Sequence, residues 1–228
     1  MRSMVRAVVL FDIDGTLVRR AGPHHRLALA AGIRSVTGLE TTLEGIDTSG
    51  CLDRDLIALM MRSVGASDEL VQDAMPQIVT EAQRAYVNGL PDLRRRVCPG
   101  VRSALRQLRS SGCVLGLVTG NLSAIGWKKV EAAGLHRWFR FGAFAEQAST
   151  RAGLARIALR HARKAGFLRR GTPACLIGDH PNDIAAARLN GIRSIAVATG
   201  VESRTRLVRH RPDVLLPDLR CLRFDMLL

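Results

Sequence analysis

Two aspartates end an apolar run near the start of the chain. Residues 7–18 read AVVLFDIDGTLV, so Asp12 and Asp14 are one residue apart and are followed by Gly15 and Thr16. Two carboxylates this close repel each other unless a cation or a proton holds them, and Mg²⁺ is a natural partner for carboxylate oxygens. Glycine lets the chain turn sharply, so that backbone amides can converge on an anion. The stretch predicts a metal- and anion-binding strand end, with plain turn formation as the alternative.

A second apolar run ends in acidic residues as well. Residues 176–183 read LIGDHPND, with Asp179 directly after the run and Asp183 four residues later. Both side chains can lie on one side of the strand end and of the first helical turn after it. Together with Asp12 they could complete a metal site made of carboxylate oxygens. The alternative is that Asp179 forms a turn and Asp183 is an ordinary helix-start charge.

A third run ends in a short polar loop, LVTGN at residues 117–121. The hydroxyl of Thr119 and the loop amides of Gly120 and Asn121 can bind phosphate oxygens, although such a loop is also common without a ligand. Ligands of parallel sheets bind at the carboxyl ends of the strands. Taken together, the three strand ends predict a nucleophile with an acid, an anion cradle and a metal clamp.

The elements that position these residues alternate between strands and helices. Continuous apolar runs are typical of strands that are buried on both faces of a parallel sheet. The alternation predicts an α/β fold with a doubly wound parallel sheet. The predicted strands are 5–11, 113–119, 174–178 and 194–198, with shorter ones at 139–144 and 214–216, and the helices between them are 101–109, 123–133, 153–165 and 182–189.

Residues 19–96 break this alternation. They contain three helical patterns, at 23–37, 52–64 and 67–88, and no convincing strand. Pro76 is expected to kink or interrupt the third helix. We interpret this stretch as a small helical domain inserted after the first strand. The predicted α/β core domain then consists of 1–18 and 97–228.

The charge of the chain is strongly basic. The 228 residues carry a formal net charge of +14, and all basic residues except Lys128, Lys129 and Lys164 are arginines. The arginines are dispersed over helix faces, which favours solvated faces over a docking groove. With only 4% aromatic residues, a base-stacking platform is poorly supported. The composition therefore argues against nucleic acid as the partner, although the basic charge is compatible with it.

Cysteine usage and hydropathy bear on the compartment. The five cysteines are scattered, without the spacing of a zinc site or a disulfide scaffold, which favours a reducing, cytoplasmic location. The first apolar run is too short for a signal peptide and ends in Asp12. No stretch has the length of a membrane span, so we expect no membrane partner.

The motifs resemble those of a known superfamily. DIDGT at 12–16, VTGN at 118–121 and GDHPND at 178–183 are similar to the first, second and fourth motifs of the haloacid dehalogenase superfamily, and specifically of its phosphoglycolate-phosphatase-like, Mg²⁺-dependent phosphatases. The helical insert is in the position of that family's small helical cap. The dehalogenases of the superfamily lack the second aspartate, so the presence of Asp14 favours phosphoryl chemistry.

The resemblance implies roles for individual residues. Asp12 would be the nucleophile that forms an aspartyl-phosphate, and Asp14 would be the general acid and base. The third motif usually supplies a lysine; here the stretch AEQASTRAGLARIAL offers Arg151, while Lys128 and Lys129 are interpreted as surface charges. The implied Mg²⁺ ligands are Asp12, Asp14 through its backbone carbonyl, Asp179 and Asp183, and the implied phosphate-binding residues are Thr119, Gly120, Asn121 and Arg151.

Substrate specificity is expected from the cap. The loop TSGCLDRD at 48–55 resembles the family's cap loop, and His180 is a further candidate for a side chain that faces the site. An alternative for the loop is that Asp53 or Ser49 caps the following helix. The pair His24 and His25 is interpreted as a surface pair, with substrate contact as the alternative. The specificity candidates in the loop are Cys51, Asp53 and Arg54.

The resemblance implies a phosphatase that acts on a small phosphorylated metabolite, similar to phosphoglycolate or a sugar phosphate. Two alternatives stay open. One is a phosphoryl transferase such as a sugar-phosphate mutase, and the other is a basic, nucleic-acid-associated phosphatase that acts on terminal phosphates. Fold alone does not identify the substrate, and the sequence gives no oligomeric state.

Overall fold

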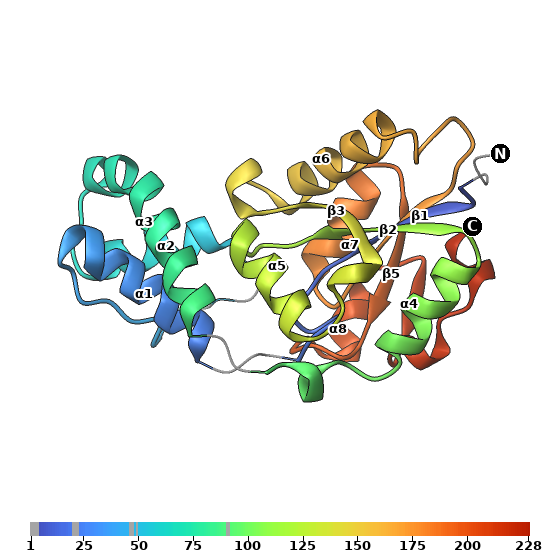
Figure 1. Ribbon diagram of the computed structural model, residues 1–228, viewed down its shortest axis with the longest axis horizontal. Helices are drawn as coiled ribbons and strands as arrows, with labels where there is room; N and C mark the ends of the chain where they lie inside the picture. The colour runs from blue at the N-terminus through green and yellow to red at the C-terminus, as the bar shows by residue number, and fades with distance from the viewer. Residues whose placement is uncertain (1–4, 20–22, 46–47, 49, 90–91) are drawn as a thin grey trace.

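The computed structural model describes residues 5–19, 23–45, 48, 50–89 and 92–228. A six-stranded sheet forms its centre, in the order β3-β2-β1-β4-β5-β6, and every neighbouring pair of strands is parallel (Figure 1). The chain moves outward from β1 in one direction and then from β4 in the other, which is a doubly wound topology. The predicted α/β fold is confirmed, including both short strands. The strands are β1 Ala7–Phe11, β2 Cys113–Val118, β3 Phe139–Ala143, β4 Ala174–Gly178, β5 Arg193–Val197 and β6 Val214–Leu216.

Helices cover both faces of the sheet. On one face α6 and α7 contribute to the apolar cluster of Val8 and Leu10, and on the other α4 packs in the cluster of Val9 and Phe11. Burial on both sides explains why the central strands are continuously apolar in sequence. These helices are α4 Val101–Ser110, α5 Ser123–Ala132, α6 Arg151–Lys164, α7 Pro181–Leu189 and α8 Arg204–Arg209, and short 3-10 helices are η1 Arg94–Arg96, η2 His136–Trp138, η3 Ala145–Gln147, η4 Leu219–Cys221 and η5 Phe224–Leu227.

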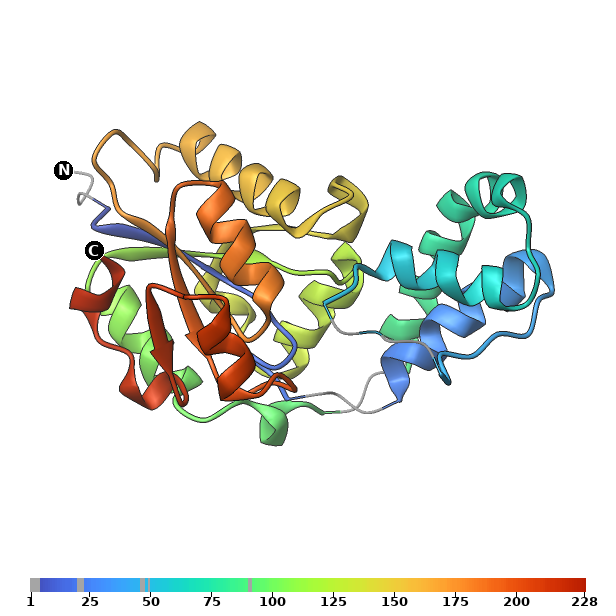
Figure 2. The ribbon, with the colours of Figure 1, turned by 180° about the vertical axis from the view of Figure 1, so that it is seen from behind.

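Three helices lie together at one end of the molecule, beyond the sheet (Figure 2). They are α1 His24–Thr37, α2 Asp53–Ser63 and α3 Asp68–Asn88, and the described residues from 23 to 89 contain no strand. We call these three helices and the loop before α2 the helical group. Val18 and Val97 form an isolated antiparallel bridge, which coincides with the predicted limits of the helical insert. The division into two domains stays a prediction. In the described part of the chain, no helix is both long and apolar enough to cross a membrane.

The third of these helices continues through Pro76, so the predicted interruption is wrong. Helix α3 has 21 residues, and Pro76 lies inside it. Proline removes one backbone hydrogen bond, but Pro76 is exposed, as is Gln72 one turn earlier, so water can reach the freed carbonyl. The opposite face of α3 is buried, with Ile78 fully inaccessible to solvent, and its packing holds the helix together.

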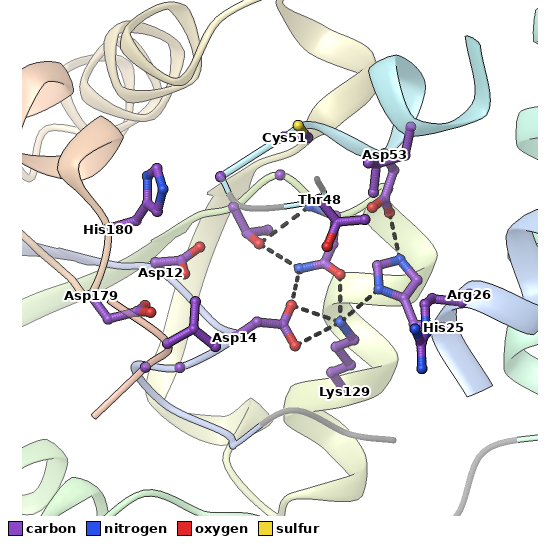
Figure 3. Close-up of a pocket in the computed structure, with 18 of the residues that line it drawn as sticks. Asp12, Asp14, His25, Arg26, Thr48, Cys51, Asp53, Lys129, Asp179 and His180 are labelled. Carbon is purple, nitrogen blue, oxygen red and sulfur yellow. Dashed lines mark hydrogen bonds and ion pairs between the residues drawn. The ribbon is translucent and has the colours of Figure 1, made fainter. Parts of the chain in front are cut away.

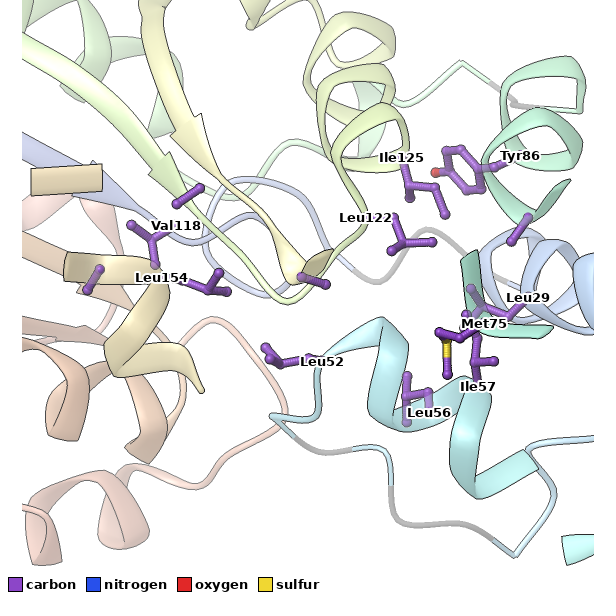
Figure 4. Packing of buried hydrophobic residues seen from close by; sticks show 14 of the residues in the cluster. Leu29, Leu52, Leu56, Ile57, Met75, Tyr86, Val118, Leu122, Ile125 and Leu154 are labelled. Atoms are coloured by element: carbon purple, nitrogen blue, oxygen red, sulfur yellow. The ribbon is translucent and has the colours of Figure 1, made fainter. Parts of the chain in front are cut away.

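An apolar cluster joins the helical group to the sheet-containing part. Tyr86 of α3 lies beside Leu122 and Ile125 at the start of α5 (Figure 4). All three side chains are at most 2% exposed, and burying side chains of this size contributes roughly 1.5–3 kcal/mol each. The start of α5 is therefore one part of the α/β core against which the helical group packs.

Candidate active site

The three polar strand ends lie at one edge of the sheet. Phe11, the last residue of β1, pairs on both sides with a residue one position before the end of the neighbouring strand. Strands β1, β2 and β4 therefore end level. Asp12, Thr119 and Asp179, which follow these strands, come together as the sequence predicts.

Three buried carboxylates form a cluster at this edge. Each of Asp12, Asp179 and Asp183 offers one oxygen, and these oxygens lie within 4.8 Å of one another. Burial raises the pKa of all three carboxyls, and the nearby Asp12 charge adds to the effect at the other two, so that the pKa of Asp183 rises to about 7. A divalent cation would relieve this repulsion, and an all-oxygen donor set suits Mg²⁺. The cluster can hold a metal ion.

The turn after β1 is shaped around one of these carboxylates. Gly15 has a φ of +85°, and a Cβ atom there would lie 2.2 Å from Oδ2 of Asp179. Thr16 Oγ1 donates a hydrogen bond to Asp179 Oδ1 at 2.8 Å. The Gly-Thr pair thus places Asp179 within the cluster, which is a role that the sequence pattern did not indicate.

Arg151 is the cation beside the cluster. It begins α6, and Thr150 caps that helix. Its Nη1 donates to Asp12 Oδ1 at 2.9 Å, and its Nε lies 3.3 Å from Asp183 Oδ1. Although burial raises the pKa of Asp12 and Asp183, the Arg151 charge acts in the opposite direction on both. Arg151 thus lies next to Asp12 and Asp183, and its role in binding phosphate stays a prediction.

Asp14 belongs to a different network (Figure 3). Lys129 Nζ donates to both carboxylate oxygens of Asp14, at 2.8 and 2.7 Å, and Asn121 Nδ2 donates to Oδ2 at 2.7 Å. Burial alone would raise the pKa of Asp14, but the Lys129 charge, with hydrogen bonds from Lys129 and Asn121, more than offsets it, so the pKa is lowered. Asp14 is thus held as a carboxylate with a fixed orientation.

The interpretation of Lys129 as a surface charge is wrong. Its side chain is 1% exposed, whereas the Lys128 side chain is 33% exposed and pairs with Glu131 at 2.9 Å. Lys129 lies on the buried face of α5 with Ile125 and Val130. The helical spacing of these apolar residues is the sequence signal that could have identified it.

The loop 119–121 faces both the cluster and the helical group. Thr119 is buried, and its Oγ1 accepts hydrogen bonds from the Asn121 backbone at 3.3 Å and from the Asn121 side chain at 2.6 Å. The Gly120 carbonyl accepts from the Asp53 amide at 2.8 Å. A Cβ atom on Gly120 would lie 2.7 Å from the Cys51 carbonyl oxygen. Glycine is therefore required for this close approach.

Asp53 and His25 of the helical group form a bonded pair. Asp53 Oδ2 lies 2.9 Å from His25 Nε2 and accepts a hydrogen bond from the Leu122 amide at 2.8 Å. Asp53 is the first residue of α2, whose N-terminus has no side-chain cap, so the alternative that Asp53 caps α2 is wrong; Ser49 lies outside the described residues. His25 is 20% exposed and its Nδ1 lies 3.3 Å from Lys129 Nζ, which also corrects its interpretation as a surface residue.

His180 lies on the opposite side of the site from His25 (Figure 3). Its Nδ1 accepts from the Asn182 amide at 3.1 Å, and its Nε2 lies 3.3 Å from Glu202 Oε1. Burial lowers the pKa of His180. Asn182 Nδ2 donates to the Gly50 carbonyl at 3.0 Å, so this side of the site also contacts the helical group.

A cavity of about 550 Å³ lies between the helical group and the carboxyl edge of the sheet. Of the predicted site residues, Asp183 and Arg54 are not among its lining residues; Asp183 is buried and Arg54 is exposed. The cations Arg19, Arg26, Lys129 and Arg151 line it together with the acids. A partly cationic cavity next to buried carboxylates suits an anionic ligand and a metal ion. The predicted residues that line it are Asp12, Asp14, Thr119, Gly120, Asn121, Arg151, Asp179, Cys51, Asp53 and His180.

The family of the chain follows from this fold and from its sequence. The family model for haloacid dehalogenase-like hydrolases matches residues 7–191. The chain belongs to this hydrolase family.

Individual relatives match over nearly the whole chain. A glyceraldehyde 3-phosphate phosphatase of Methanopyrus kandleri is 29% identical, over 86% of this chain and 85% of the relative. A phosphoglycolate phosphatase of Agrobacterium fabrum is also 29% identical, over 94% of this chain and 90% of the relative. Among solved structures, CbbY of Rhodobacter sphaeroides in complex with phosphate has a TM-score of 0.70 at 20% identity, covering 98% of this chain and 99% of its own. At that identity the structural likeness concerns the fold alone.

Proposed function

We propose that the chain is a Mg²⁺-dependent phosphatase that hydrolyses a small phosphorylated metabolite through an aspartyl-phosphate on Asp12. Membership of the hydrolase family and the phosphatase relatives make the chain a phosphatase. What we propose beyond this activity is the use of Mg²⁺, the aspartyl-phosphate intermediate and the class of substrate. By analogy with the two relatives, the substrate is of the phosphoglycolate or glyceraldehyde 3-phosphate type, and a cavity of about 550 Å³ suits a molecule of that size.

The placement of Asp12 is the observation that carries the proposal. Its carboxylate lies at the end of the central strand, beside Asp179 and Asp183, and accepts a hydrogen bond from Arg151. A carboxylate that is surrounded by cation-binding groups and opens into a cavity can attack a phosphorus atom while its surroundings balance the phosphoryl charge.

The proposed reaction consists of two successive displacements at the phosphorus atom. Asp12 forms a bond to phosphorus while the bond to the leaving oxygen breaks, and Asp14, which has taken up a proton from the solvent before this step, gives that proton to the leaving oxygen. A water molecule then attacks the phosphorus of the aspartyl-phosphate, Asp14 takes a proton from that water, and Asp12 is released as a carboxylate. The residues proposed to neutralise the phosphoryl oxygens are Thr119, Gly120, Asn121 and Arg151.

The acidic cluster fits Mg²⁺ by the chemistry of its donors. The proposed ligands are the carboxylates of Asp12, Asp179 and Asp183 and the backbone carbonyl of Asp14. When bound, Mg²⁺ would neutralise the charge of the phosphate and of the carboxylates. The glycines beside Asp179 leave room only for hydrogen, since a Cβ atom on Gly200 would lie 1.7 Å from its Oδ2.

Phosphate release from a panel of phosphorylated metabolites tests the proposal. The panel contains phosphoglycolate, glyceraldehyde 3-phosphate, sugar phosphates and nucleotides, each with Mg²⁺ and with a chelator. We expect release from at least one small metabolite, only with Mg²⁺, and its loss in Asp12→Asn. Transfer of the phosphate to a sugar instead of to water, or release that is independent of Mg²⁺, would contradict the proposal.

A further inference from the structure

Helix α5 lacks a cap from its own sequence. Its N-cap residue is Leu122, whose apolar side chain cannot accept a hydrogen bond, and the first amides of a helix need external acceptors. Two of these acceptors come from the helical group. Asp53 Oδ2 accepts from the Leu122 amide at 2.8 Å, and Gln83 Oε1 accepts from the Ala124 amide at 2.7 Å. Side chains of α2 and α3 thus bind two amides at the start of α5, while Glu146 of η3 accepts from the Ser123 amide between them at 3.0 Å.

Asp53 also orients the histidine next to it. Lys129 Nζ lies 3.3 Å from His25 Nδ1, and an ammonium group can only donate hydrogen bonds. His25 Nδ1 is therefore the acceptor, and Nε2 carries the proton that it donates to Asp53 Oδ2 at 2.9 Å. With its side chain 3% exposed, Asp53 holds one tautomer and one ring orientation of His25 against Lys129.

Each of the two groups that Asp53 contacts is next to a residue that donates a hydrogen bond to Asp14. The Leu122 amide directly follows Asn121, which donates to Asp14 at 2.7 Å. His25 faces Lys129, which donates to Asp14 at 2.8 and 2.7 Å. A displacement at Asp53 would therefore reach both groups that orient the Asp14 carboxylate.

We propose that Asp53 is a positioning residue, which places Asp14 for proton transfer when the helical group is seated on α5. The inference rests on the proposed function, because it assigns Asp14 the proton transfer to the leaving oxygen. It differs from the prediction that Asp53 selects the substrate. A specificity residue would change substrate binding, whereas a positioning residue changes the rate of the step that needs Asp14.

The leaving group of the substrate provides the test. An alkyl phosphate needs a proton on its leaving oxygen, whereas p-nitrophenyl phosphate releases a stable anion and needs little protonation. Asp14 also takes the proton of the attacking water with either substrate, so only the first turnover, before the aspartyl-phosphate is hydrolysed, separates the two roles. Release of the leaving group in the first turnover from phosphoglycolate or glyceraldehyde 3-phosphate and from p-nitrophenyl phosphate is measured with Mg²⁺ for the wild type, Asp53→Ala, His25→Ala and Asp55→Ala. Asp55 is the matched control, since it is exposed in the first turn of the same helix. Melting curves check that each variant is folded.

We expect Asp53→Ala to lower the first-turnover rate for the alkyl phosphate by about 30-fold, with KM within about threefold of the wild type. Its first-turnover rate for p-nitrophenyl phosphate should stay within about threefold of the wild type. His25→Ala, which leaves the Leu122 contact in place, should show the same selectivity with a smaller loss, and Asp55→Ala should match the wild type. His25→Ala provides the test by itself if Asp53→Ala does not fold.

Three results would overturn the inference. They are an equal loss for both kinds of substrate, a loss confined to KM, and retention of the alkyl phosphatase rate in both variants. An active wild type with any of these results leaves the proposed function intact. A wild type that releases no phosphate from either compound would instead overturn the proposed function, and the inference with it.

Discussion

Two buried cations contact different acidic side chains of the site. Arg151 contacts Asp12 and Asp183, whereas Lys129 contacts Asp14. Asp12 and Asp14 are one residue apart in sequence, yet burial raises the pKa of the first carboxyl, while Lys129 lowers that of the second against the effect of burial. Opposite shifts in neighbouring carboxyls are a common basis for different roles in catalysis. Asp14, held as a carboxylate, is suited to accept a proton from water.

Replacing Lys129 tests this division. Lys129→Met keeps the length of the side chain but removes the charge that stabilises the Asp14 carboxylate. We expect kcat to fall about 100-fold, with a much smaller change in KM, in steady-state assays with Mg²⁺. Lys128→Met is the control, because Lys128 is partly exposed and pairs with Glu131 on the same helix. Equal rates for the two variants would show that Lys129 has no part in the reaction.

The acidic cluster predicts that stabilisation by Mg²⁺ depends on pH. The pKa of Asp183 in the folded, metal-free protein is about 7, above the ordinary value of 3.8 that applies to the unfolded chain. The folded state therefore binds more protons between these values, and the free energy of unfolding falls as the pH rises through this range. At pH values above this range Asp183 is already ionised, so Mg²⁺ can bind the cluster without displacing a proton from Asp183.

Thermal melting with and without Mg²⁺ measures the effect. At about pH 8, Mg²⁺ at 100 times the Kd that applies at this pH should raise Tm by roughly 5–10 °C. The same Mg²⁺ concentration at about pH 5 should give a clearly smaller rise in Tm. Asp183→Asn should reduce the difference between the two pH values. An equal rise in Tm at both pH values would contradict the assignment of Asp183 to the cluster.

At the scale of elements, α5 connects the two parts of the site. The loop before it carries Thr119, its buried face carries Lys129, and two of its first amides are bound by the helical group. The loop that precedes α2 lies directly on Gly120, whose carbonyl accepts from the Asp53 amide at 2.8 Å. Both loops also line the cavity beside the carboxylates.

Gly120→Ala tests the importance of that contact. Gly120 does not have a positive φ, so alanine suits its backbone, but the added Cβ would lie 2.7 Å from the Cys51 carbonyl. We expect kcat/KM to fall about 10-fold or more and Tm to change little, because the strain falls on the seating of the loop.

Gly89→Ala is the matched control for Gly120→Ala. At Gly89 the φ is −115° and a new Cβ atom would make only an ordinary contact, at 3.6 Å from the Ala85 carbonyl. Its kcat/KM should equal that of the wild type. A Gly120→Ala variant with the same kcat/KM as Gly89→Ala would mean that close seating of the loop is not needed for turnover.

At the scale of the whole molecule, the sequence predicts those features whose signals are local. Buried parallel strands are continuously apolar, and the acids at their ends are adjacent to them in sequence, so the sheet and Asp12, Asp14, Asp179 and Asp183 could be identified. Arg151 could be placed only through the resemblance to a family. The site residues stay predictions, although the structure brings most of them together around one cavity.

The features that the sequence did not predict depend on contacts between distant segments. Asp14 and Lys129 are 115 positions apart, and Asp53 and Leu122 are 69 apart. No local pattern indicates that an apolar N-cap on one helix receives its acceptor from another part of the chain. Likewise, the continuity of α3 through Pro76 depends on which face of that helix is buried.

Trapping the phosphorylated enzyme tests the central claim most directly. The wild type and Asp12→Asn are mixed with the best substrate of the panel and Mg²⁺, quenched in acid during turnover, and digested for mass spectrometry. We predict a phosphoryl group on the wild-type peptide that contains Asp12, none on the variant, and no phosphate release by the variant. Phosphate release by Asp12→Asn at the wild-type rate, or a phosphoryl group on a different residue, would contradict the account.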